Sequence, residues 1–260
     1  MSDKHVDYDQ IAPVYDRRFA ANRRDGTTAA LCSLARELDA ERVLEVGCGT
    51  GRWLADLYPV ADQLYGLDLS IGMLNQARKR AERYHLVRGP ASRLPFPDVV
   101  FDLVYCVNAI HHFDHPRAFI SEARRLLRPG GALAVVGTDP RGRKDSWYVY
   151  RYFKGVYEAD LRRFPSWGMV LDWMVEEGLE GVECRLVERI LERKVGWEVL
   201  SDPFLQKNSC SQLALLSDEA YATGLRRIKA ALRQAEAAGE TLTFPSDISI
   251  AMLIARQGNI

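Results

Sequence analysis

The chain has 260 residues, 47% of them hydrophobic, and its 35 lysines and arginines are balanced by 35 aspartates and glutamates. This length and apolar content are enough to bury the core of one large α/β domain. The even charge balance argues against a global attraction to nucleic acid or to an anionic membrane. The polar start and the lack of an apolar run near the ~18 residues of a spanning helix predict no signal peptide and no membrane span.

The cysteines and histidines favour neither disulfides nor a metal. Five cysteines are scattered and form no Cys-x-x-Cys pair, which is typical of reduced thiols and a cytoplasmic protein. His111, His112 and His115 lie close together, but no cysteine or carboxylate set completes a tetrahedral site around them. We therefore expect no bound metal.

The first 30 residues are expected to form a helical cover. In residues 8–21, Ile11, Tyr15 and Phe19 are spaced four apart, which predicts a helix with one apolar stripe. That stripe either closes over a ligand or packs on the core without touching one. An amphipathic helix is predicted next, over Thr27 to Leu38.

A glycine-rich turn over residues 42–51 organises the rest of the chain. An apolar run there breaks into three glycines, as a buried strand does when it turns sharply into a helix: Gly47, Gly49 and Gly51. Glycine allows a ligand to approach backbone N–H groups closely. Arg52 stands where a dinucleotide fold needs glycine or alanine, and the Gly-Lys-Ser/Thr of a P-loop is also missing. The spacing therefore argues against NAD and against a P-loop.

Asp68 ends the second predicted strand, Leu64 to Leu69. It follows the first glycine by one βαβ step, so both strand ends are expected at the same edge of the sheet. A carboxylate there can accept hydrogen bonds from two adjacent ribose hydroxyls. The alternative is that Asp68 caps the following helix, a role for which Ser70 is better placed.

Three further strands are predicted in the first half of the chain. The first is short and spans His85 to Gly89. The second spans Val99 to Val107 and is apolar enough to be buried on both faces. The third spans Ala132 to Gly137 and follows a helix that ends at Pro129 and the next two glycines. The strand ending at Val107 delivers residues 108–115 to the ligand edge.

The second half of the chain is expected to combine two strands with helical insertions. Residues 138–181 crowd many aromatic side chains into a predicted lid, as core or as pocket lining. Strands are predicted at Val182 to Ile190 and at Ser249 to Arg256. The helical insertion between them, residues 195–246, is longer than a turn requires and either caps a substrate or forms a homodimer contact.

Several of these motifs, in this order and spacing, carry a resemblance. They are the Glu45 to Gly51 turn, Asp68, Arg93 to Phe96, Phe101 to Tyr105 and Leu127 to Gly131. Over residues 43–137 the chain resembles the class I S-adenosylmethionine-dependent methyltransferases, most of all their ubiquinone/menaquinone-biosynthesis branch. The resemblance implies an α/β fold, with a doubly wound, seven-stranded, mostly parallel sheet of the Rossmann-like methyltransferase type. A single methyltransferase domain over residues 1–260, with helical lid insertions, is expected.

The resemblance also implies the cofactor, S-adenosyl-L-methionine, and its contacts. The helix starting at Arg52 suits the amino-acid carboxylate, and Glu45 is expected to answer the α-ammonium group. Tyr15 is the candidate for closing the methionine end. Asn108 and Ala109 are expected beside the transferable methyl.

The adenosine contacts follow the same resemblance. Asp68 is expected on the ribose, and Leu69 and Met73 against the adenine. Pro90 stands where relatives commonly carry an aspartate, and it offers neither a side-chain acceptor nor a backbone donor. Recognition of the adenine amino group therefore falls to Ala91 and Ser92.

The expected function is methyl transfer to a small, apolar or aromatic molecule. His111 and His112 are the candidate general bases, or alternatively core or hydrogen-bonded histidines. An RNA or protein methyltransferase is the first alternative, because five cations could form a basic rim: Arg141, Arg143, Lys144, Arg162 and Arg163. A non-catalytic S-adenosylmethionine-binding relative is the second. The neutral charge favours the small molecule, and no nucleic-acid partner is expected.

Overall fold

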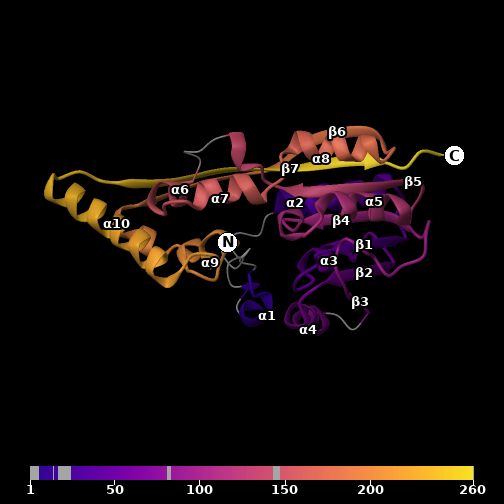
Figure 1. Ribbon diagram of the computed structural model, residues 1–260, viewed down its shortest axis with the longest axis horizontal. Helices are drawn as coiled ribbons and strands as arrows, with labels where there is room; N and C mark the ends of the chain where they lie inside the picture. Colours follow the sequence, from indigo (N-terminus) through magenta and orange to yellow (C-terminus); the bar gives the residue numbers. More distant parts are fainter. Residues whose placement is uncertain (1–5, 14, 17–24, 81–82, 143–146, 260) are drawn as a thin grey trace.

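The computed structural model describes residues 6–13, 15–16, 25–80, 83–142 and 147–259, and its centre is one sheet (Figure 1). The seven strands lie in the order β3-β2-β1-β4-β5-β7-β6. All neighbouring strands are parallel except that β7 runs antiparallel to both β5 and β6. Strand bounds are β1 Arg42–Val46, β2 Gln63–Asp68, β3 His85–Arg88, β4 Phe101–Val107, β5 Leu127–Gly137, β6 Glu180–Val195 and β7 Thr243–Arg256. The predicted doubly wound, mostly parallel sheet is confirmed.

Helices cover both faces of the sheet because alternate strand residues point to opposite sides. On β4, Leu103 and Tyr105 belong to a core shared with α2, α3 and α4, whereas Val104 and Cys106 belong to a core shared with α5 and α8. The helix bounds are α2 Asp25–Glu37, α3 Arg52–Leu57, α4 Ile71–Arg80, α5 Pro116–Leu126 and α8 Trp167–Glu176. No helix in the described ranges combines the length and apolar character that crossing a membrane requires.

The N-terminal helix is shorter than the sequence predicts. α1 spans only Tyr8–Ile11, and Phe19 of the expected stripe lies outside the described residues. Ile11 packs with Met73, at the start of α4. The Asp9 carboxylate accepts hydrogen bonds from the Ser70 hydroxyl at 2.6 Å and from the Gly72 N–H at 2.7 Å, which fastens α1 to α4.

The last two strands are longer than predicted and project beyond the sheet. β7 pairs with β5 only from Ala251 to Arg256, whereas its pairing with β6 continues to Thr243 opposite Val195. We call the part of this hairpin beyond β5 the arm; Figure 1 shows β7 running along it towards α10. The arm and its insertion carry η5 Gly196–Ser201, η6 Pro203–Leu205, α9 Ser211–Ala214 and α10 Asp218–Ala237.

The two expected lid segments meet in a third core. η3 Pro140–Gly142, α6 Tyr148–Tyr152 and α7 Val156–Arg163 come from the first segment. Tyr148, Phe153 and Val156 pack there with Ile228 and Leu232 of α10. Part of the aromatic crowding seen in the sequence therefore serves packing of the two insertions against each other.

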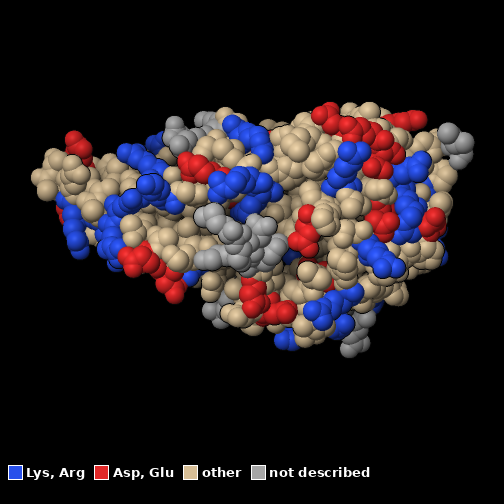
Figure 2. Space-filling model, viewed as in Figure 1, with Lys and Arg blue, Asp and Glu red and all other residues tan. Residues whose placement is uncertain are grey.

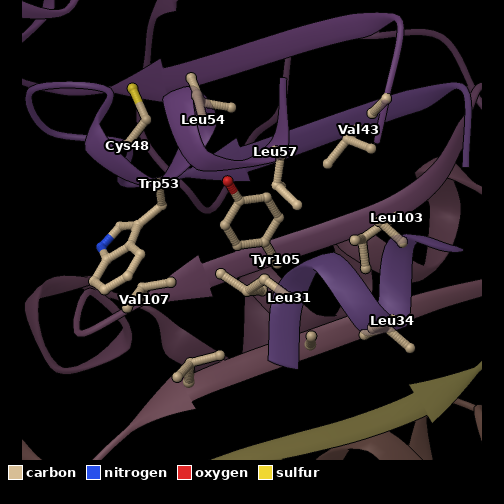
Figure 3. Close-up of a cluster of buried hydrophobic side chains, with 14 of the residues drawn as sticks. Leu31, Leu34, Val43, Cys48, Trp53, Leu54, Leu57, Leu103, Tyr105 and Val107 are labelled. Carbon is tan, nitrogen blue, oxygen red and sulfur yellow. The ribbon is translucent and has the colours of Figure 1, made fainter. Parts of the chain in front are cut away.

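Glu45 lies in the core, contrary to the expectation that it faces the cofactor. Its side chain is fully buried, and Oε2 accepts a hydrogen bond from the Tyr105 hydroxyl at 3.1 Å. Figure 3 shows the Tyr105 ring among Leu31, Leu54 and Leu57, beneath α2 and α3. Glu45 shares a strand face with Val43, so the strand alternation directs it under these helices and away from the ligand edge.

Burial raises the pKa of Glu45 well above its usual value, and the hydrogen bond from Tyr105 offsets only part of that effect. Its Oε1 has no hydrogen-bond partner among the described residues. Between the unfolded and folded pKa values, the folded chain holds a proton that the unfolded chain releases. Stability contributed by this group is therefore present at low pH and is lost as pH rises, by about 1.4 kcal/mol per pH unit.

Glu45→Gln should remove this pH dependence, because glutamine keeps the shape but has no proton to release. The free energy of unfolding of the variant should exceed that of the parent by a margin that grows above about pH 5, at about 1.4 kcal/mol per unit. Urea unfolding at pH 5, 6 and 7 measures the margin. Parallel pH profiles for the two proteins would contradict the buried, protonated state.

Candidate cofactor and substrate site

The glycine turn forms one wall of a cavity of about 280 Å³, the first cavity. Gly47 and Gly49 have φ angles of +74° and +54°, in the left-handed region that glycine tolerates. A Cβ added to Gly49 would meet nothing within 4 Å, whereas one added to Gly47 would come within 2.6 Å of the Ala109 Cβ. Gly49 therefore presents bare backbone to the cavity, and Gly47 allows the close approach of the β4 end.

Gly51 does not line this cavity, although the sequence placed it with the ligand. It precedes α3 with a φ of +70°, and an added Cβ would come within 3.0 Å of the Ala77 Cβ. Its role in the fold is close packing of the turn against α4.

The Asp68 carboxylate joins the ends of β1 and β2. Oδ2 accepts a hydrogen bond from the Gly49 N–H at 2.8 Å, and Oδ1 accepts one from the Ser70 N–H at 2.9 Å. Burial raises the pKa of Asp68, and these backbone hydrogen bonds act in the opposite direction. Each oxygen retains a lone pair, and the residue lines the first cavity, so the carboxylate can still accept from ligand hydroxyls.

Most of the residues expected to bind the cofactor line the first cavity. They are Tyr15, Gly47, Gly49, Asp68, Leu69, Met73, Ala91, Ser92, Asn108 and Ala109. Pro90 lines it as well. Glu45 and Gly51 are the expected residues that it does not bring there.

The N-terminal cover is tied to the glycine turn beside Tyr15. Asp16 accepts a hydrogen bond from the Thr50 hydroxyl at 2.8 Å and forms an ion pair with Arg80. Arg80 also donates to the Thr50 carbonyl oxygen at 2.8 Å. These contacts hold Tyr15 over the first cavity.

A second cavity, of about 250 Å³, adjoins the first. The two share Tyr8, Tyr15, Asn108 and His112 in their linings. The second cavity continues along the arm, where its walls are Trp147, Tyr150, Phe164, Ile190, Asp202, Phe204, Cys210 and Ser246, among others. It therefore combines aromatic side chains of residues 138–181 with residues of the insertion.

His112 lies where the two cavities meet. Its Nε2 is hydrogen bonded to the Tyr8 hydroxyl at 2.7 Å. His111 lines only the second cavity and stacks on Phe164, with ring centroids 3.8 Å apart. Asn108, beside them, adopts a φ of +50°, in the left-handed region that asparagine enters more readily than most other non-glycine residues.

Sequence reasoning missed Tyr8 and the arm residues. Tyr8 had a signal, since Tyr8-Asp9 and Tyr15-Asp16 repeat the same pair seven residues apart on one cover segment. Asp202 and Phe204 had no such signal in the sequence, because only the folding of the insertion brings them to the cavity.

Within the described part of the chain, no group of His, Cys, Asp and Glu is arranged to bind a metal.

Comparisons with known proteins agree with this geometry. A family model described as a methyltransferase domain matches residues 44–135. Over 135 residues the chain is 38% identical to a phthiotriol/phenolphthiotriol dimycocerosates methyltransferase of Mycobacterium ulcerans, covering 50% of this chain and 45% of the relative. Over 219 residues it is 27% identical to a demethylmenaquinone methyltransferase of Bacillus licheniformis, covering 75% of this chain and 93% of the relative.

A solved structure shows the same fold. Phosphoethanolamine N-methyltransferase 2 of Haemonchus contortus, in complex with S-adenosyl-L-methionine, superposes with a TM-score of 0.60 at 18% identity, covering 96% of this chain and 57% of that one. The chain spans about half the length of the mycobacterial relatives it matches. The chain thus contains a matched methyltransferase domain, is similar in sequence to methyltransferases that include members of the quinone-biosynthesis branch, and shares the fold of an S-adenosylmethionine-bound methyltransferase.

Proposed function

We propose that this protein transfers the methyl group of S-adenosylmethionine to a small, largely aromatic or apolar molecule held in the second cavity. The observation that carries the proposal is the pair of adjoining cavities, which share Tyr8, Tyr15, Asn108 and His112. A donor in one cavity and an acceptor in the other would meet at these residues. The sulfonium of the donor supplies an already activated methyl group, so the protein mainly aligns the reactants and excludes water.

The chain offers groups that fit the donor in the first cavity. Asp68 presents a carboxylate, held by the Gly49 and Ser70 N–H groups, that can accept from the ribose hydroxyls. The open space at Gly49 lets a ligand approach the backbone. Leu69 and Met73 provide apolar contact for the adenine, with Ala91 and Ser92 at the position next to Pro90.

His112 is the better placed of the two candidate bases. It lines both cavities, and the hydrogen bond between its Nε2 and the Tyr8 hydroxyl restrains the orientation of its ring. His111, by contrast, is packed flat on Phe164. We propose that His112 removes the proton when the acceptor is a hydroxyl or a carbon acid, and that His111 shapes the wall next to it.

The cations that could have formed a nucleic-acid rim are partly engaged within the fold. Arg141 pairs with Asp139 and donates to the Leu161 and Phe164 carbonyl oxygens. Arg163 pairs with the buried Asp160. On the face that Figure 2 shows, positive and negative residues lie among one another. These contacts support a small-molecule acceptor over RNA.

We also propose a cytoplasmic setting. All five cysteines are free, which supports a reducing compartment.

Asp68→Asn should weaken binding of S-adenosylhomocysteine by about 10- to 100-fold, because a charged acceptor of ribose hydroxyls becomes neutral. Isothermal titration calorimetry measures the dissociation constant. Asp62→Asn, at an exposed position between α3 and β2, is the matched control and should leave it unchanged. An unchanged constant in Asp68→Asn, with the fold intact by circular dichroism, would remove Asp68 from the site.

His111→Gln and His112→Gln, made singly, should lower turnover without a matching loss of cofactor affinity. The larger effect is expected for His112, by about 10²- to 10⁴-fold if it is the general base. Formation of S-adenosylhomocysteine from a panel of phenols and quinols measures turnover, and calorimetry measures cofactor affinity. Parent-like activity in both variants would refute base catalysis by either histidine.

Tyr8→Phe should lower turnover in the same assay, because it removes the hydroxyl that orients His112. If His112 is the general base, the pH dependence of turnover should also shift, because the variant loses the hydrogen bond to its ring. Tyr152→Phe, on α6 and outside both cavities, is the control. A turnover loss with an unchanged pH profile would assign Tyr8 to packing alone.

A further inference from the structure

Among the described residues that line the second cavity, the charged side chains are all acidic. Its described lining residues include no lysine or arginine but four carboxylates: Asp139, Glu192, Asp202 and Asp247. Three of these form ion pairs with cations outside the lining, Asp139 with Arg141 at 3.0 Å, Glu192 with Lys194 at 3.3 Å and Asp247 with Arg189 at 2.7 Å. For Asp202, no cation among the described residues forms such a pair.

Asp202 is also buried, at 5% exposed. It lies between η5 and η6, where Oδ2 accepts a hydrogen bond from the Tyr148 hydroxyl and Oδ1 accepts one from the Phe204 N–H, each at 2.8 Å. Burial, and then the Asp202 charge, raise the pKa of Tyr148, so its hydroxyl stays protonated and donates. Both donors are neutral, and each oxygen retains a lone pair. A buried carboxylate without a cation is costly, and a positive ligand group would offset that cost.

Aromatic rings surround the same space. Trp147 and Tyr150 line the cavity with ring centroids 5.5 Å apart, and Phe204 follows Asp202 in the lining. The faces of aromatic rings attract cations, most strongly when the cation is desolvated. A carboxylate bordered by aromatic rings therefore suits an organic ammonium group and disfavours an anionic one.

We infer that the methyl acceptor carries a protonated amine, which Asp202 and the neighbouring aromatic rings bind as an anchor. The inference rests on the proposed function and specifies its substrate class. A protonated nitrogen has no lone pair with which to accept a methyl group, so the anchored amine is not the nucleophile. Asp202 does not line the first cavity, so it binds the acceptor while a second group of that molecule reaches Asn108 and His112.

The competing account is that Asp202 only caps η6, since its side chain accepts from the Phe204 N–H. Asp202→Asn separates the two accounts. Asparagine keeps an acceptor for that N–H and nearly the same shape, but it has no charge. A capping role would therefore survive the substitution, whereas ammonium binding would not.

The test uses two probes of one skeleton, phenethylamine and 2-phenylethanol, which differ in charge at pH 7. Calorimetry on the protein saturated with S-adenosylhomocysteine gives both dissociation constants. We expect the amine to bind the parent at least about tenfold more tightly than the alcohol. In Asp202→Asn, amine affinity should fall to that of the alcohol, while alcohol affinity stays within error and the melting temperature does not fall.

Asp218→Asn is the matched control, because it removes the same charge from the same insertion at a side chain that is 95% exposed and outside the cavity. It should retain the preference for the amine. Equal binding of the two probes, binding of neither, or an equal loss of both in Asp202→Asn would overturn the anchor. A parent protein that fails to bind S-adenosylhomocysteine would overturn the proposed function itself, whereas cofactor binding without amine preference would overturn only this inference.

Discussion

The hydrogen bonds that Asp68 accepts from Gly49 and Ser70 are the constraint on which the site depends. One carboxylate joins the turn after β1 to the start of α4, so two segments nineteen residues apart are fixed at the same sheet edge. The α1 cover is then fastened to the same place, because Asp9 accepts from Ser70 and Gly72. An aspartate that looks like a helix cap in sequence thus organises a cavity, and it does so while keeping lone pairs for a ligand.

Local pattern predicted most of the lining of the first cavity, because the signals there are local. The glycine turn, the apolar runs and the proline and glycine stops all act over a few residues, so the first five strands and the grouping of Gly49, Asp68 and Asn108 at one edge followed from them. Glu45 does not line the first cavity, and the reason is equally local. Proximity to the turn suggested ligand contact, but the two-residue alternation of the strand directs the side chain beneath α3, where it meets Tyr105.

The rest of the site depended on contacts between distant segments. Tyr148 and Asp202 are separated by 54 positions, and Tyr8 and His112 by 104, yet each pair shares a hydrogen bond. No periodicity or residue spacing in a single sequence reveals either of these two contacts. The long β6–β7 pairing brings the insertion back to residues 138–181. The sequence predicted too short a β6, because charged residues alternate along the part of this strand that extends beyond β5.

Of the two cavities, the matched domain lines most of the first and the arm lines only the second, so their sequences can change separately. The matched family domain ends at residue 135, before the lid and the arm that form most of the second cavity's walls. Under the proposed function, substitutions and length changes in the arm would alter which acceptor is taken while the donor half stays intact.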